Sequence, residues 1–243
     1  MDTTLLTFIV LGLTALVVAA VIFLLWGERT STRDATIALV SGGVLSLWAV
    51  VATTLAYRGV FEPQAAESFP PVGINLVVVL SVLFLSLITS VSLRRLLTRQ
   101  SQLIRLHVWR LVGIVFLLLM VSGQVPALWA LPAGIGDILV GVTAPWVAHD
   151  VETRRGKRRA VIWNLFGLSD LVVAVGLGIM TSPGPTQVFQ TVPTSELMAH
   201  FPLALVPTFL VPLAFVLHVV SLWQLVAGAW GADPAGASFA QSR

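Results

Sequence analysis

The sequence predicts an all-α, polytopic transmembrane bundle of seven helices. Hydrophobic residues make up 57% of the 243 positions, and charged residues make up only 10%. Apolar runs of about 20 residues recur along the whole chain, which is the length that an α-helix needs to cross the hydrocarbon core of a bilayer. An outer-membrane barrel would instead show short segments of alternating polarity, and the sequence has no such pattern.

The apolar runs define the approximate limits of the spans. We expect seven helices over about 5–26, 35–57, 72–93, 108–125, 129–148, 160–180 and 201–227. The first run is too long for the core of a signal peptide and no basic residue precedes it, so we expect it to remain as a helix. These helices form one transmembrane domain, 1–230. The small and polar residues of 231–243 predict a short, disordered cytoplasmic tail.

The basic residues predict the orientation of the bundle. Of the 14 Lys and Arg residues, the connections on one side and the tail hold Arg29, Arg33, Arg94, Arg95, Arg99, Arg105, Arg154, Arg155, Lys157, Arg158, Arg159 and Arg243. The other side holds Arg58, and Arg110 lies at the inner end of the fourth span. Cytoplasmic loops are enriched in Lys and Arg. We therefore expect an external N-terminus and a cytoplasmic C-terminus in the plasma (inner) membrane.

The charge distribution also bears on partners and cofactors. The sequence pI is about 10.5, but the basic residues are spread over short loops, so nucleic acid is not an expected partner. Cysteine is absent, which excludes disulfides and thiolate metal sites; we expect no metal and no cofactor. The basic connection before the fourth span contains Arg94, Arg95, Arg99 and Arg105. It predicts either a surface helix that binds anionic lipids or a set of arginines that only fixes topology.

Two related segments each place a carboxyl group inside an apolar run. Gly134-Ile-Gly-Asp137 in the fifth span has a counterpart in Gly167-Leu-Ser-Asp170 in the sixth. Each aspartate follows a glycine by three residues. Ionisable side chains within a membrane are costly to bury and are usually functional, so Asp137 and Asp170 are the main candidates for a site.

The two aspartates are expected at one depth. At the helical rise, Asp137 lies roughly 12 Å from the outer end of its span and Asp170 roughly 15 Å from the inner end of its own. In a core of about 30 Å both are close to the midplane. His218 falls near the same level, and Asn164 lies below Asp170. Two carboxyls in low dielectric cannot both ionise cheaply, so we expect at least one to hold a proton near neutral pH.

Small residues accompany each aspartate on one helical face. Gly134 and Gly141 share a face with Asp137, and Gly167 and Ala174 share a face with Asp170. Small residues allow membrane helices to approach closely. The short connection predicts that the fifth and sixth spans are antiparallel neighbours. The two small faces either meet or both look into the centre of the bundle.

These residues support a leading function and an alternative. The leading interpretation is coupling or passage of a proton, a cation or a small solute through the aspartate pair. Pro202, Pro207 and Pro212 would free backbone carbonyls in the last span, which fits a wet pocket that opens outward above the aspartates and His218. In the alternative, the protein is a structural or signalling partner, and the aspartates only clamp helices together.

A membrane enzyme or a haem protein is the third interpretation. Gly134–Asp137 matches the GxGD signature of intramembrane aspartyl proteases and 126–128 matches their PAL motif, but the order of the motifs is reversed here. His107, His149 and His218 are possible axial ligands of a haem. No two of these histidines are predicted to lie at one depth, so the sequence favours neither chemistry.

The chain resembles uncharacterised bacterial seven-span integral membrane proteins. The resemblance depends on residues 132–145, which contain Asp137, and on residues 163–170, which end at Asp170. It covers mainly the fourth to seventh spans. It implies the fold and a bacterial membrane setting, and it brings no activity with it.

Overall fold

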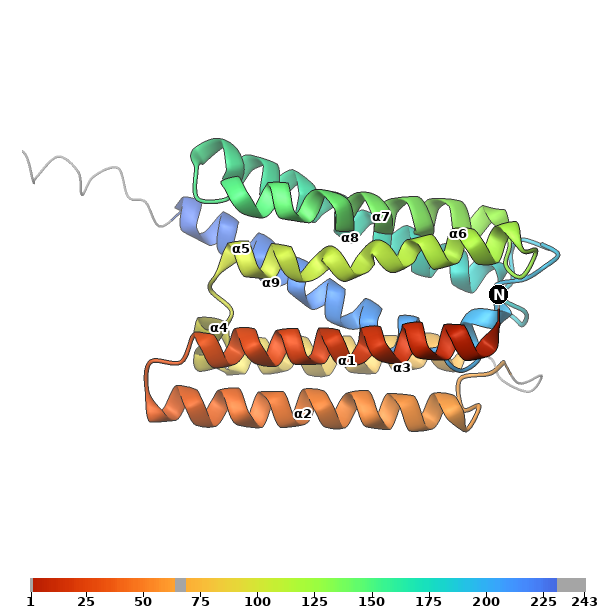
Figure 1. Cartoon of the computed structure of the whole chain (residues 1–243), viewed down its shortest axis with the longest axis horizontal. Coiled ribbons are helices and arrows are strands. Elements are labelled where there is room, and N and C mark those ends of the chain that lie inside the picture. The colour runs from red at the N-terminus through yellow and green to blue at the C-terminus, as the bar shows by residue number, and fades with distance from the viewer. Residues whose placement is uncertain (1, 64–68, 231–243) are drawn as a thin grey trace, which may run out of the picture.

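The computed structural model describes residues 2–63 and 69–230, and all regular structure within these ranges is helical (Figure 1). Seven helices of the described chain are long and apolar enough to cross a membrane. The predicted all-α class and the number of candidate spans are thus confirmed. The predicted tail, 231–243, lies outside the described residues.

The helices follow one another with short connections. In order, the elements are α1 (Thr3–Gly27), α2 (Thr32–Tyr57), α3 (Pro71–Thr89), α4 (Val91–Leu96), α5 (Gln100–Arg105), the 3₁₀ helix η1 (Leu106–Val112), α6 (Gly113–Val121), α7 (Ala127–Asp150), α8 (Arg154–Thr181), the 3₁₀ helix η2 (Glu196–Ala199), the π-helix η3 (Val206–Leu210) and α9 (Val211–Trp230). The fourth candidate span, Gln100–Val121, joins α5, η1 and α6. The seventh, Val206–Val226, joins η3 and most of α9.

The bundle has two groups of helices with α9 between them (Figure 1). One group contains α1, α2 and α3, and the other contains α7 and α8, with α5, η1 and α6 packed on α7. The last helix, α9, crosses obliquely and contacts both α8 and α3. Most buried side chains of the described chain form one continuous core that reaches from α1 to α9.

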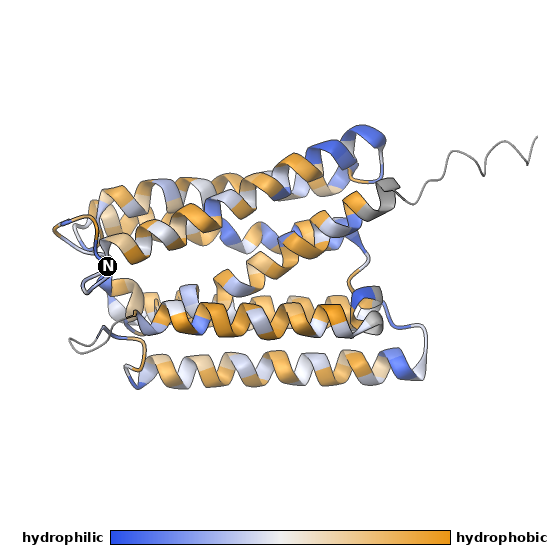
Figure 2. Ribbon diagram, turned by 180° about the vertical axis from the view of Figure 1, so that it is seen from behind, coloured by the Kyte–Doolittle hydropathy of each residue, from blue (hydrophilic) through white to orange (hydrophobic). Residues whose placement is uncertain are grey.

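The basic connections lie together at one end of the bundle, which we call the basic end. The α1–α2, α4–α5 and α7–α8 connections and the last turn of α9 are all found there (Figure 1). The N-terminus and the α2–α3 and α8–η2 connections lie at the opposite end. Hydrophilic residues concentrate near the two ends, while the length of the helices is mostly apolar (Figure 2). This arrangement matches the predicted grouping of charge.

The fourth span begins earlier than predicted, at Gln100 instead of about residue 108. Its first turns look like a loop in sequence because they carry arginines, glutamines and a histidine. Leu103 and Ile104 of α5 are nevertheless fully buried, so this polar segment has an apolar inner face. Arg105 and Arg110 therefore lie inside the span. Within the basic connection, α4 is a short separate helix, while α5 continues directly into η1 as the start of the fourth span.

Candidate functional site

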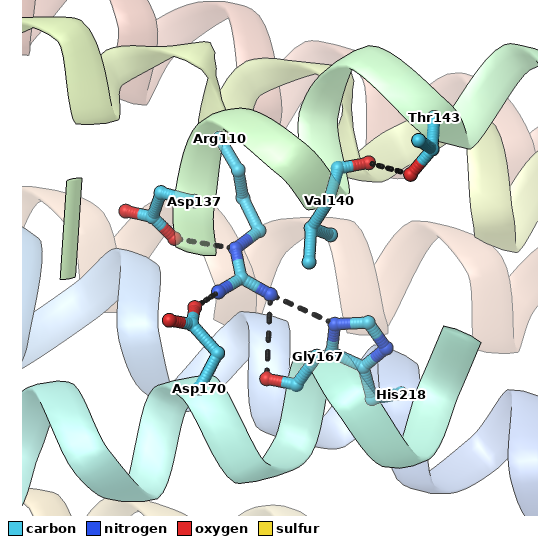
Figure 3. A network of polar contacts seen from close by, with 7 residues as sticks. All are labelled: Arg110, Asp137, Val140, Thr143, Gly167, Asp170 and His218. Carbon is cyan, nitrogen blue, oxygen red and sulfur yellow. Dashed lines mark hydrogen bonds and ion pairs between the residues drawn. The ribbon is translucent and has the colours of Figure 1, made fainter. Parts of the chain in front are cut away.

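Arg110 of η1 is the centre of a buried polar cluster (Figure 3). Its Nε donates a hydrogen bond to Oδ1 of Asp137 at 2.6 Å, and its Nη2 donates to Oδ2 of Asp170. Its Nη1 donates to the carbonyl of Gly167 at 3.5 Å and lies 3.0 Å from Nε2 of His218. The arginine is 0% exposed. One guanidinium thus holds groups from α7, α8 and α9.

Glycines allow the helices around Arg110 to come this close. A Cβ added to Gly113 would lie 2.5 Å from the carbonyl oxygen of Gly134 and 2.7 Å from Cβ of Asp137, so α6 and α7 touch through backbone. A Cβ on Gly136 would overlap the carboxyl of Asp170. Small residues permit such close backbone approach in membrane bundles. The motif around Asp137 therefore supplies both the carboxyl and the space for its neighbours.

The contact with Arg110 defines the tautomer of His218. Because an arginine only donates hydrogen bonds, Nε2 of His218 must accept, which places the ring proton on Nδ1. Nδ1 then donates to Oδ1 of Asn164 at 2.9 Å. The amide of Asn164 donates to the carbonyl of Ala160 at 2.8 Å and to Oγ of Ser221 at 2.9 Å. The imidazole is therefore neutral in this hydrogen-bond arrangement.

The hydrogen bonds continue from Ser221 toward the basic end. Ser221 Oγ donates to Oε1 of Gln100 at 2.8 Å, and Gln100 Nε2 donates to Oε1 of Gln224 at 2.7 Å. Gln224 in turn donates to the carbonyl of Leu97 at 2.6 Å. Both glutamines are half-buried. The side chains of His218, Asn164, Ser221, Gln100 and Gln224, which we call the polar chain, thus connect Arg110 with the basic end.

A cavity reaches the cluster from the other direction. It has a volume of about 100 Å³ and lies between α3, α6, α7, α8 and α9. Pro63, Pro70 and Ser182 line it near the opposite end of the bundle, and Asp137 lines it at depth. Asp137 is the single ionisable residue among the described residues that line it. A volume of only about 10–15 Å³ is enough for one water molecule, so the cavity has the volume of several, with Asp137 as the charged group that could bind water at its inner end.

The structure brings the four predicted site residues into one cluster. Asp137 and Asp170 each contact Arg110, His218 contacts Arg110 directly, and Asn164 contacts His218. The cavity in the structure has a different floor from the pocket that the sequence predicts. Of the three residues assigned to that floor, only Asp137 lines the cavity, because Arg110 separates it from the other two.

Arg110 itself is not among the site residues that the sequence predicts. The sequence places this residue at the inner end of a span that is predicted to begin near residue 108. Counting from Gln100 instead places Arg110 about 15 Å along the helix, at the level of the aspartates. Ser221 and Gln100 are also not among the predicted residues. For Ser221 the sequence does contain a signal, because Ser221, Gln224 and His218 share a polar face on the last span.

The glycines on the two small faces pack against the fourth span and α9. A Cβ on Gly134 would meet Leu117 at 2.8 Å, and one on Gly141 would lie 2.9 Å from the backbone nitrogen of Leu111, so both face the fourth span. A Cβ on Gly167 would meet the ring of His218 on α9. Both small faces therefore look into the centre of the bundle, which was one of the two predicted arrangements.

The helices α7 and α8 are still neighbours in the bundle. The carbonyl of Ala174 on α8 accepts a hydrogen bond from Nε1 of Trp129 on α7 at 3.0 Å. Nearer the basic end, Nε1 of Trp163 on α8 donates to Oγ1 of Thr143 on α7 at 2.9 Å. These two bonds tie the helices together above and below the cluster.

The sequence predicts that no two of the histidines lie at one depth in the membrane, but the structure brings two of them together. The rings of His107 and His218 lie 3.9 Å apart between centroids, since η1 brings His107 into the bundle. His107 is hydrogen-bonded through Nδ1 to the carbonyl of Leu103 at 3.0 Å. Two imidazoles in direct ring contact leave no space for a macrocycle between them, so this pair does not fit a haem. His149 lies at the end of α7 beside Asp150.

The charges of the cluster do not balance within the protein. Arg110 contributes one positive charge, two ionised carboxylates contribute two negative charges, and His218 is neutral. Charges removed from water are costly unless they are paired, and among the described residues no further cation contacts either carboxyl. One carboxyl must therefore carry a proton, or an external cation must complete the set. This is the chemical property that distinguishes the cluster from a simple ion pair.

A family model matches residues 68–226 of the chain, and its description is Domain of unknown function (DUF8737). The match covers more than half of the chain, including both aspartate segments, Arg110 and the polar chain. The chain therefore belongs to this family. No curated protein and no solved structure matches the chain.

Proposed function

We propose that this family member is a multi-pass protein of the plasma membrane that couples or passes a proton, a cation or a small solute through Asp137 and Asp170. The observation that carries the proposal is the single guanidinium of Arg110 between two buried carboxyls. Such a set is neutral only with one additional positive charge, and a proton is the smallest candidate. If that charge exchanges, the site has the property that coupled transport requires.

Access from two directions supports this function. The cavity reaches Asp137 from the opposite end of the bundle. The polar chain begins at His218 and ends at the half-buried Gln224 near the basic end. Imidazole and hydroxyl groups both donate and accept hydrogen bonds and can take part in proton transfer, and amide side chains can orient water molecules beside them. The cavity thus approaches Asp137 from one end of the bundle, and the polar chain runs from Arg110 toward the other end.

The orientation and the lipid contacts belong to the same proposal. The basic end would face the cytoplasm, since positive loops are retained there. Arg99 pairs with Glu28, and Arg94 donates to the carbonyl of Leu87 at 2.5 Å, so both are engaged within the protein. Arg105 is exposed on α5. Arg105 is thus the best placed of these three residues for an anionic lipid head group.

The alternative is a structural or signalling role in which the cluster only clamps helices. One observation favours it: Arg110 is fully buried and joins three other helices through hydrogen bonds. A clamp of this kind does not need the carboxyls to exchange a proton. The two functions therefore differ in a measurable property of Asp137 and Asp170.

Infrared spectroscopy of the purified protein tests that property. Proton coupling predicts a protonated-carboxyl band that changes over about pH 5–9 and that is altered in the variants D137N and D170N. The matched control is D150N, at the exposed end of the same helix α7, which should leave this band unchanged. A band that does not respond to pH in the parent, with both cluster variants as stable as the parent, would leave the clamp as the better interpretation.

Reconstitution into liposomes then tests passage. With a trapped pH-sensitive dye and an imposed membrane potential, the parent and D150N should acidify or alkalinise the lumen faster than protein-free liposomes. D137N and D170N should return the rate to the protein-free level. Equal rates for the parent and both cluster variants would contradict the assignment of these carboxyls.

A further inference from the structure

The cavity that ends at Asp137 has mostly apolar walls, although it leads to a carboxyl group. Its lining is almost entirely aliphatic or aromatic and includes Phe116, Trp129 and Leu171. The hydroxyl of Ser195, one of the few polar groups in the lining, is already bonded to the carbonyl of Gly178 at 2.7 Å. Inorganic cations such as Na⁺, Mg²⁺ or Ca²⁺ need several oxygen ligands. These walls do not offer such a set.

Two aromatic rings stand in the wall of the same cavity, and Trp129 lies about two turns before Asp137 on α7. The ring centroids of Phe116 and Trp129 are 5.2 Å apart with an angle of 49° between the planes. The indole is held in place because its Nε1 donates to the carbonyl of Ala174. Aromatic faces attract organic cations, and pockets of aromatic side chains are the usual recognition element for methylated ammonium groups.

One oxygen of the Asp137 carboxyl is left to interact with such a cation. Its Oδ1 accepts from Arg110, and no described group donates to Oδ2. Figure 3 shows Oδ2 pointing away from the guanidinium. A cation in the cavity would supply the positive charge that the cluster lacks.

The volume limits the size of the ligand. An apolar cavity of about 150 Å³ accommodates benzene, which has six heavy atoms. The cavity at Asp137 has about 100 Å³. The whole cavity therefore sets an upper limit of roughly four or five heavy atoms for the cation, by proportion to that example.

From these four observations we infer that the cavity binds a small alkylammonium ion, with its charge on Asp137 and its alkyl groups against Phe116 and Trp129. This inference rests on the proposed function and names the ligand class for the same site. Binding places one positive charge beside the cluster, so the proton held by the carboxyls leaves to water. The ligand and the proton then compete for one site, which is the condition for exchanging one against the other.

Titration with tetramethylammonium tests the inference on the purified full-length protein in detergent. Calorimetry should show saturable binding, and a pH indicator in weak buffer should show release of protons on binding. The neutral control is tert-butanol, which has the same number of heavy atoms and should not bind. D137N should weaken binding about tenfold or more, because it removes the negative charge that attracts the quaternary ammonium, and D150N should bind like the parent.

A second variant covers the case in which D137N does not fold. V175F fills the cavity from α8 and leaves both carboxyls in place. V175F should abolish tetramethylammonium binding, and its infrared spectrum should keep the pH-dependent carboxyl band that the parent shows. Absence of binding in the parent, or equal binding of tert-butanol, would overturn the alkylammonium site even where that band titrates. Binding that V175F or a folded D137N does not affect would also overturn it. Binding to the parent without proton release would support the site but contradict the proton coupling.

Discussion

Replacing Arg110 with methionine should destabilise the bundle strongly. The substitution keeps much of the side-chain volume but removes every donor to Asp137, Asp170 and His218. Breaking a buried ion pair by removing one partner costs about 3–5 kcal/mol. At about 2–4 °C per kcal/mol for a chain of this size, the melting temperature should fall by roughly 6–20 °C.

The loss should depend on the carboxyls that are left behind. The triple variant R110M/D137N/D170N replaces both carboxyls with amides that can bond to each other, so it should recover most of the lost stability. R110K should fall between the parent and R110M, since one ammonium group cannot reproduce the planar fork of the guanidinium. R110K thus separates the effect of the positive charge from the effect of the guanidinium geometry.

Thermal unfolding in detergent, followed by circular dichroism or tryptophan fluorescence, measures these differences. The matched control is R105M, which removes an exposed arginine from the same span and should melt close to the parent. An R110M protein that melts within about 2 °C of the parent, less than about 1 kcal/mol, would refute the view that Arg110 organises the cluster.

Four further predictions follow from single contacts. G136A should lower the melting temperature, because its Cβ overlaps the carboxyl of Asp170; G12A, where an added Cβ meets nothing within 4 Å, is the control. G141L should separate α7 from η1 and also destabilise, whereas unchanged melting would place the close contact elsewhere. S221A should interrupt the polar chain and slow proton movement in liposomes without a comparable loss of stability. K157C, in a chain without native cysteine, should react with an impermeant thiol reagent only after the membrane is opened.

Much of the fold can be predicted from the sequence alone. The candidate spans and the grouping of basic residues at one end depend on local composition, because hydrophobic length and loop charge are properties of consecutive residues. The common level of Asp137 and Asp170 follows in the same way from a constant rise per residue. His218 and Asn164 were found by the same counting.

The identity of the group between the aspartates was decided by packing. Arg110 looked like an interfacial residue, because only the burial of Leu103 and Ile104 shows that the span begins at Gln100. Likewise, the partners of Gly134 and Gly141 depend on the rotation of α7 against η1, which no local pattern encodes.

The route from the cluster to the basic end was also a matter of tertiary structure. The polar chain takes Asn164 from α8, Gln100 from α5 and the rest from α9, so its bonds join residues more than 50 positions apart. Helical periodicity describes the polar face of a single helix. Three such faces meet here because small residues and the oblique path of α9 bring their helices into contact, and that contact turns isolated polar residues into one connected site.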